Sequence, residues 1–242
     1  AQPNYGLITN IGQAHLEGFG SLEGVRRTKG ELYDSVRARE GILFYHEEDE
    51  VLRQMSLGTE RISYGSSPKA YVQGVASPST GESLFLHFSW SCPILEMSPR
   101  EVQTQLVGDY NLANALAAIA IGLYFDVPSD KIDEALTSYC PSNSRSQLIH
   151  SERGNQIIAD AYNANPSSMR TALSNFLAIE PALRPRIVIL GDMNELGTSS
   201  HEAHQELYQK LASTTTPPLE IYLCGPHWRE ELGDQPQVYP NV

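Results

Sequence analysis

Residues 156–166 read QIIADAYNANP, and this stretch decides the fold of the chain. Its apolar start has the length and composition of a buried strand that ends at Asp160. A polar loop follows, and the Asn-Pro pair at its end is typical of the start of a helix. A strand, a polar loop and a helix in this order make the repeating unit of a parallel α/β sheet.

The same order recurs further along the chain. We expect helices at 167–179 and 200–212 and strands at 186–190 and 219–224. This alternation predicts a parallel sheet covered by helices. Residues 235–242 stop where a further helix and strand would be expected.

The N-terminal side has a mixed pattern. Apolar residues at steps of three and four predict a helix over 22–36, and the region 50–106 is strand-rich. Four further elements are expected: strands at 5–11 and 41–45, and helices at 110–124 and 129–138, the last with Ser129 as N-cap. The short polar segment 139–144 is typical of a linker, so we predict domains at 1–141 and 142–242.

Composition excludes several classes of protein. The length of 242 residues suits one large or two ordinary domains, and 40% apolar residues suffice for a packed core. A net charge of −12 argues against generic nucleic-acid binding, and no apolar run is long enough to predict a membrane span. Three widely spaced cysteines favour a reducing compartment. The start lacks a signal peptide and a Met, which we interpret as a cut or internal boundary.

Five polar clusters are candidates for chemistry. The first, 10–21 (NIGQAHLEGFGS), leaves a strand end and contains His15, which can offer an imidazole to a metal or donate to a phosphate. A lone loop histidine more often bonds only backbone. Lys29 lies on the apolar spacing of the next helix, where a lysine needs a partner or a changed charge. The default for a lone lysine is a solvated one.

The second and third clusters flank the predicted linker. Asn111 and Asn114 are three apart and share a helix face, where amides can bond the edge of a purine. A capping Asn followed by a surface Asn is the plain alternative. Arg145 comes just after the linker and can reach a phosphoryl group when domains close, although a surface arginine is the default.

The fourth and fifth clusters each follow a predicted strand. Asp160 can accept ribose hydroxyls, and in the plain alternative Asn165 or Ser167 only caps the next helix. The fifth cluster, 190–197 (LGDMNELG), also places an acidic loop directly after a predicted strand. Two such loops on one edge of a sheet predict a cleft. A glycine-rich phosphate loop ending in Gly-Lys-Ser/Thr is absent, and no Ser-His-Asp arrangement is apparent.

Taken in order, the five clusters resemble the Mur ligase family over roughly residues 4–200, most closely its D-alanyl-D-alanine-adding branch. The resemblance implies a central ATP-binding domain followed by a Rossmann-like C-terminal domain, both incomplete. The family's UDP-sugar domain and phosphate loop would precede Ala1, so we expect a fragment that is inactive alone.

The resemblance also implies ATP and Mg²⁺ as cofactors. His15 would be a magnesium ligand, and Lys29, carbamylated, would hold a second magnesium. The other implied contacts are Asn111 and Asn114 to adenine, Asp160 to ribose, Arg145 to the ATP phosphates, and Tyr162, Asn163 and Asn165 to the dipeptide.

The implied function is ligation of D-alanyl-D-alanine to UDP-N-acetylmuramoyl-tripeptide through an acyl phosphate, by a cytoplasmic monomer. One alternative is a sister ligase of the same fold, such as a folylpolyglutamate synthase or another cell-wall amino-acid ligase. The other is a non-catalytic partner module, which the absent phosphate loop favours if this chain is the whole gene product.

Overall fold

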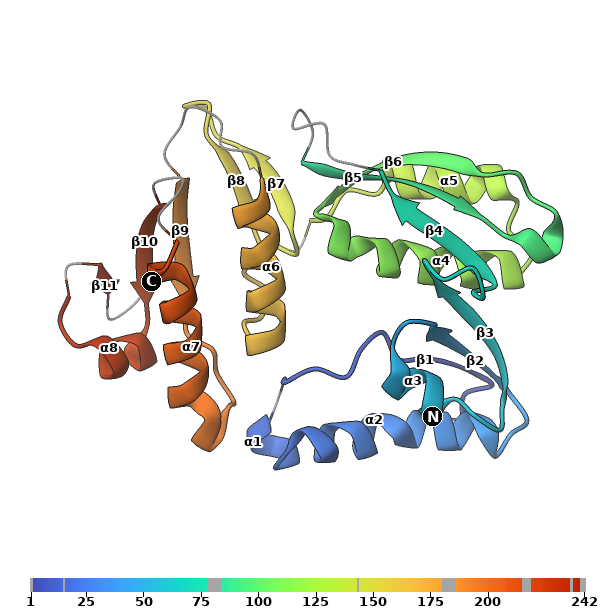
Figure 1. Ribbon diagram of the computed structural model, residues 1–242, viewed down its shortest axis with the longest axis horizontal. Helices are drawn as coiled ribbons and strands as arrows, with labels where there is room; N and C mark the ends of the chain where they lie inside the picture. Colours follow the sequence, from blue (N-terminus) through green and yellow to red (C-terminus); the bar gives the residue numbers. More distant parts are fainter. Residues whose placement is uncertain are drawn as a thin grey trace. The chain divides into compact units, whose positions relative to one another are not determined.

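The chain folds into two compact units, which we describe separately (Figure 1). The first comprises Ala1–Ile11 and Arg26–Ala159, and the second comprises Gly12–Val25 and Asp160–Val242. This computed structural model describes residues 2–14, 16–77, 84–142, 144–179, 186–214, 219–235 and 237–239. The division at 141/142 stays a prediction about domains, since the units are defined by contacts alone.

The first unit is built on a six-stranded sheet whose strands follow chain order. The first four strands run parallel, and the fifth runs antiparallel to both of its neighbours. The strands are β1 (Tyr5–Leu7), β2 (Ile42–His46), β3 (Glu60–Gly65), β4 (Val72–Ala76), β5 (Phe85–Ser91) and β6 (Arg100–Val107). The helices are α2 (Leu22–Arg37), which begins in residues of the second unit, α3 (Glu50–Met55), α4 (Leu112–Tyr124) and α5 (Ser129–Ser138).

Close packing of α4 on the sheet forms the core of this unit. Leu116 and Ile119 of the apolar helix α4 are fully buried in one cluster with Phe88 and Trp90. A Cβ at Gly74 of β4 would lie 2.5 Å from a Leu116 methyl carbon, so any larger residue here would force the Leu116 side chain to shift. The glycine inside a strand pattern therefore marks a helix contact.

Two details differ from the sequence prediction in the first unit. The strand expected at 5–11 ends at Leu7, and the Asn10 carbonyl beyond it accepts a hydrogen bond from Lys29 instead of pairing with a strand. Ser129 begins α5 but does not cap it. The N-cap is Pro128, whose carbonyl accepts from the backbone N–H groups three and four residues on.

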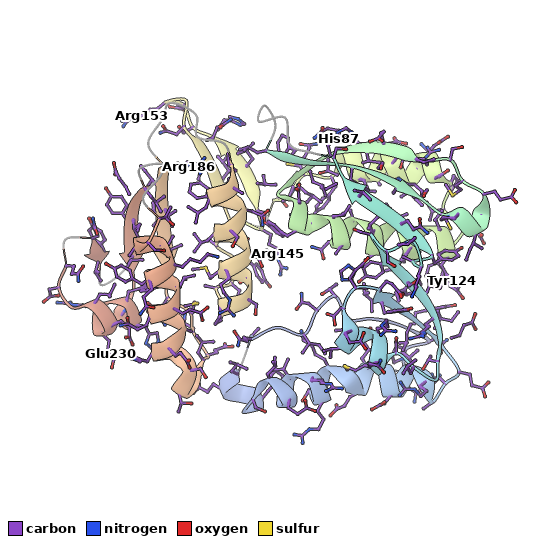
Figure 2. The ribbon with its side chains drawn as sticks, in the orientation of Figure 1. His87, Tyr124, Arg145, Arg153, Arg186 and Glu230 are labelled. Atoms are coloured by element: carbon purple, nitrogen blue, oxygen red, sulfur yellow. The ribbon has the colours of Figure 1, made fainter. Side chains whose placement is uncertain are left out.

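The second unit contains a three-stranded parallel sheet in the order β11 (Val238–Tyr239), β10 (Leu219–Cys224) and β9 (Arg186–Gly191). Its helices are α1 (Leu16–Phe19), α6 (Pro166–Ala178), α7 (Ser200–Ala212) and α8 (Pro226–Leu232). Arg186 joins β9 to α6 by donating to the Phe176 and Leu177 carbonyls, both at 3.1 Å (Figure 2). The helix α8 and the strand β11 occupy a region where the sequence prediction had no element.

The strand predicted at 156–160 lies outside this parallel sheet. β8 (Gln156–Ala159) pairs antiparallel with β7 (Gln147–His150) in a separate hairpin. A tight turn joins them, with Gly154 at φ 77° and its N–H donating to the Ser151 carbonyl. The expectation that the fourth and fifth clusters follow strands of one sheet was therefore wrong.

The loop between β9 and α7 is held by two buried contacts. The Asp192 carboxylate accepts from the backbone N–H groups of His227 and Trp228, at 3.0 and 3.1 Å, and so caps α8. The fully buried His204 accepts from the Met193 N–H through Nε2 at 3.1 Å. Its Nδ1 lies 2.8 Å from the Ser200 carbonyl, so Nδ1 carries the proton. None of the described helices is long and apolar enough to cross a membrane.

We expect the buried imidazole of His204 to make the second unit sensitive to acid. Burial lowers the pKa of His204 below its ordinary 6.5. The unfolded chain then binds this proton more readily, so the free energy of unfolding falls as the pH drops below about 6.5. In His204→Gln the free energy of unfolding should be about 1–3 kcal/mol lower than in the parent at neutral pH, because the Met193 hydrogen bond is disturbed. Its further decrease in acid should be smaller than that of the parent.

Denaturant melts at about pH 7.5 and about pH 5.5 measure both effects. His150→Gln, at an exposed position of β7, is the control and should match the parent at both values. If the free energy of unfolding of His204→Gln fell between the two pH values by as much as that of the parent, this role for the imidazole would be contradicted.

Candidate functional site

Lys29 is held at the end of the first strand of the sheet. Its Nζ donates to the Asn10 carbonyl at 2.9 Å, across the segment that follows β1. Partial burial lowers the pKa of Lys29, because removing water disfavours the ammonium. At a given pH, the fraction of molecules in which Lys29 is a neutral amine, its nucleophilic form, is therefore larger than for a fully solvated lysine.

Most of the first cluster belongs to the second unit. His15 itself lies outside the described residues, but its neighbours are placed. The Gln13 N–H donates to Ser167 Oγ at 3.2 Å, and the Glu17 N–H donates to the Glu195 carbonyl at 3.0 Å. Leu16 packs against the apolar core of this unit. The structure thus brings together the first, fourth and fifth clusters, which lie far apart in the sequence.

The fourth cluster combines a helix cap with exposed polar groups. Asn165 Oδ1 accepts from the N–H groups of Ser167 and Ser168, at 3.1 and 3.0 Å, and the Ser168 side chain completes a capping box. The capping alternative is therefore confirmed for Asn165, whose amide oxygen is engaged. Asp160, Tyr162 and Asn163 are exposed, with Tyr162 at 62%.

The second cluster has one buried and one exposed amide. Asn111 is buried, and its Nδ2 donates to the Val107 carbonyl at 2.9 Å. Its Oδ1 accepts from Asn114 Nδ2 at 3.2 Å. Asn111 thus supports the start of α4, and Asn114 is the exposed member of the pair. Because the Asn111 amide is buried and hydrogen-bonded, Asn114 is the more accessible of the two.

The third cluster is tied to the second within the first unit. The hydroxyl groups of Tyr110 and Ser146 are hydrogen-bonded, and Tyr110 directly precedes Asn111. Arg145, exposed in the segment before β7, lies between Ser144 and Ser146, whose φ values are 54° and 50° (Figure 2). Left-handed backbone at non-glycine residues persists only where surrounding contacts hold it. The Tyr110–Ser146 bond is such a contact, and sequence reasoning missed it.

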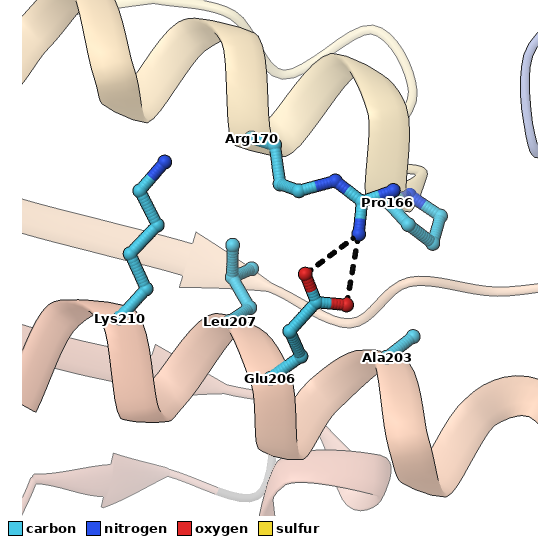
Figure 3. Close-up of a pocket in the computed structure, with 6 residues that line it drawn as sticks. All are labelled: Pro166, Arg170, Ala203, Glu206, Leu207 and Lys210. Carbon is cyan, nitrogen blue, oxygen red and sulfur yellow. Dashed lines mark hydrogen bonds and ion pairs between the residues drawn. The ribbon is translucent and has the colours of Figure 1, made fainter.

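Two hollows lie in the second unit. A hollow of about 420 Å³ adjoins the fifth cluster and is lined by Gly197, Thr198, Ser200, His201, His227, Glu230 and Glu231. It is large enough for a small molecule. The other hollow, between α6 and α7, has about 10 Å³ and is lined by Pro166, Arg170, Ala203, Glu206, Leu207 and Lys210 (Figure 3). It holds at most one water molecule.

Sequence reasoning also missed Arg170 of α6. Its Nη2 donates to Gln13 Oε1 at 2.7 Å, and its Nη1 contacts both carboxylate oxygens of Glu206. No periodicity or spacing could pair Gln13 with a residue 157 positions away. Among the residues that the structure describes, no group of three or more His, Cys, Asp or Glu could hold a metal ion.

Family comparisons divide the chain into two matched regions. Residues 1–122 match the Mur ligase middle domain, and residues 144–235 match the Mur ligase, glutamate ligase domain. The chain is 30% identical over 207 residues to the UDP-N-acetylmuramoyl-tripeptide–D-alanyl-D-alanine ligase of Bacillus subtilis, covering 85% of this chain and 43% of that protein. For the ligase of the same name from Escherichia coli the values are 30% over 211 residues, 85% and 44%. The chain therefore spans less than half the length of these relatives.

Solved structures of MurF enzymes also resemble this chain. The chain resembles MurF from Acinetobacter baumannii with a TM-score of 0.79 and 26% identity, over 100% of this chain and 51% of that one. It resembles MurF from Thermotoga maritima in complex with ADP with a TM-score of 0.79 and 22% identity, over 100% and 53%. The second likeness concerns the fold alone.

Proposed function

We propose that this chain, which belongs to the Mur ligase family, is part of an ATP-dependent ligase that joins D-alanyl-D-alanine to UDP-N-acetylmuramoyl-tripeptide. The observation that carries the proposal is the meeting of three polar clusters in the second unit, through the Gln13–Ser167 and Glu17–Glu195 hydrogen bonds. Relatives that are 30% identical and bear this ligase name support the choice of substrates.

In the proposed reaction, the terminal carboxylate of the tripeptide attacks the γ-phosphorus of ATP, and ADP leaves. The amine of D-alanyl-D-alanine then attacks the acyl carbon, phosphate leaves, and the nitrogen loses a proton. This chain would supply binding and charge. Asn114 would bond the adenine with Asn111 supporting it, Asp160 the ribose, and Arg145 the phosphates. Tyr162 and Asn163 are exposed and remain proposed contacts for the dipeptide. Asn165 is a third proposed contact, through its amide N–H groups, because the helix cap uses only its amide oxygen.

Magnesium would offset the charge of the transferring phosphoryl group. As an ammonium, Lys29 does not suit a cation. Its lowered pKa and its place beside Asn10 suit carbamylation, in which the neutral amine adds to CO₂ and releases a proton. The resulting carbamate would be an anion able to hold the metal, and we propose this role for Lys29. His15 remains the second proposed ligand.

We further propose a monomer that works in the cytoplasm. Two competing functions follow from the same fold. A sister ligase would share Lys29 and Asp160 but act on another amino acid, and a non-catalytic module would bind without turnover. Among the contacts of the described residues, none favours one of these over the dipeptide ligase.

We expect Lys29→Ala in the full-length protein to lower ligation at least about 100-fold, because the carbamate is lost. Added short carboxylic acids should restore part of the activity by supplying a carboxylate at the same place. The control is Lys131→Ala, which removes an exposed lysine paired with Glu134 and should leave activity unchanged. Ligation by Lys29→Ala within about twofold of the parent would remove this lysine from the site.

Phosphate release tests the proposed function itself. The full-length protein is given ATP, Mg²⁺ and UDP-N-acetylmuramoyl-tripeptide, with and without D-alanyl-D-alanine. Release that requires the dipeptide is expected. Release that requires a different amino acid would assign a sister ligase, and no release by the folded protein with any acceptor would assign a non-catalytic module.

A further inference from the structure

Two hydrogen bonds of Gln13 tie the loop 12–21, which contains the short helix α1, to α6. The backbone N–H of Gln13 donates to Ser167, and its side-chain oxygen accepts from Arg170. Ser167 and Arg170 are three positions apart on α6 and therefore share a face of the helix. Backbone and side chain of one residue are thus both held by one helix face.

Arg170 is itself oriented from the other side. Its Nη1 lies 3.0 and 2.8 Å from the two carboxylate oxygens of Glu206 on α7, while its Nη2 reaches Gln13 (Figure 3 shows the Glu206 contacts). The guanidinium is planar and rigid, so fixing one nitrogen on Glu206 sets the direction of the other. Lysine, with a single flexible ammonium, cannot hold both partners in this geometry.

The ion pair contributes little to the stability of the fold. The side chains of Arg170 and Glu206 are 35% and 58% exposed, and pairs of this kind are worth at most about 1 kcal/mol. What the ion pair fixes is the direction of the Arg170 guanidinium toward Gln13 of the loop. The loop needs such support, because a Cβ at Gly18 or Gly20 would meet nothing within 4 Å, and Gly20 has φ 75°.

We propose that Arg170 is a positioning residue, which uses Glu206 as its anchor to hold the loop 12–21 in place for phosphoryl transfer. This role rests on the proposed function, since the loop is the first of the clusters assigned to the ATP and metal site. Arg170 acts through Gln13 and touches no substrate in this account.

Hydrogen exchange tests the contact independently of catalysis. In the full-length protein, Arg170→Ala should speed exchange in the peptide that contains the Glu17 N–H, which donates to Glu195. Gln13→Ala should do the same while leaving the Arg170–Glu206 pair intact, so it covers the case in which Arg170→Ala unfolds locally. Arg229→Ala is the matched control, because it removes an exposed arginine paired with Asp234 in the same unit. Unchanged exchange in both Arg170→Ala and Gln13→Ala would overturn the proposal.

Kinetics test the positioning role. We expect kcat to fall about tenfold in Arg170→Ala and in Gln13→Ala, with KM for D-alanyl-D-alanine unchanged and with Arg170→Lys intermediate. Arg229→Ala should keep the parental kcat. Faster exchange with an unchanged kcat would overturn the role in the reaction. Faster exchange in a protein whose parent shows no dipeptide-dependent turnover would reject the proposed function and leave the loop contact standing.

Discussion

The hydrogen bonds of Gln13 to α6 are the contacts on which the arrangement of the second unit's polar clusters depends. They join segments 154 and 157 positions apart, and with the Glu17–Glu195 bond they place the loop 12–21 on this unit. The chain leaves the first unit after Ile11 and returns to it at Arg26. Because ordering a glycine-containing loop is entropically unfavourable, these contacts and the burial of Leu16 must offset that cost.

Several polar residues of the clusters also support the backbone. Asn165 caps α6, Asp192 caps α8, and Asn111 bonds the end of β6. A helix cap is worth about 1 kcal/mol, so substitution of such a residue changes stability as well as binding. Loss of activity alone would therefore not identify these residues as ligand contacts. Asn114 and Asp160 are exposed, and substitutions at exposed positions usually change stability less than those at buried ones.

The sequence predicted the helices well, because each buries one apolar face: α2, α4 and α7 lie within two residues of their predicted bounds, an ordinary margin for helix ends. It failed for the sheet partner of β8, since an apolar run of three residues does not reveal which strand it pairs with. Candidate residues beside strand ends were found by residue type. Arg170 and Tyr110 were missed because their role depends on tertiary contacts with Gln13 and Ser146.

Glu17 of the loop 12–21 lies against the loop that follows β9, where its N–H donates to the Glu195 carbonyl. A Cβ at Gly197 would lie 3.8 Å from the Cβ of Glu17, within the range that a disulfide spans. The direct test is therefore the full-length double variant Glu17→Cys/Gly197→Cys, with Cys140 and Cys224 replaced by Ser, oxidised and analysed by mass spectrometry. We expect rapid formation of an intramolecular disulfide between positions 17 and 197. Free thiols at both positions after oxidation of the folded protein would contradict it.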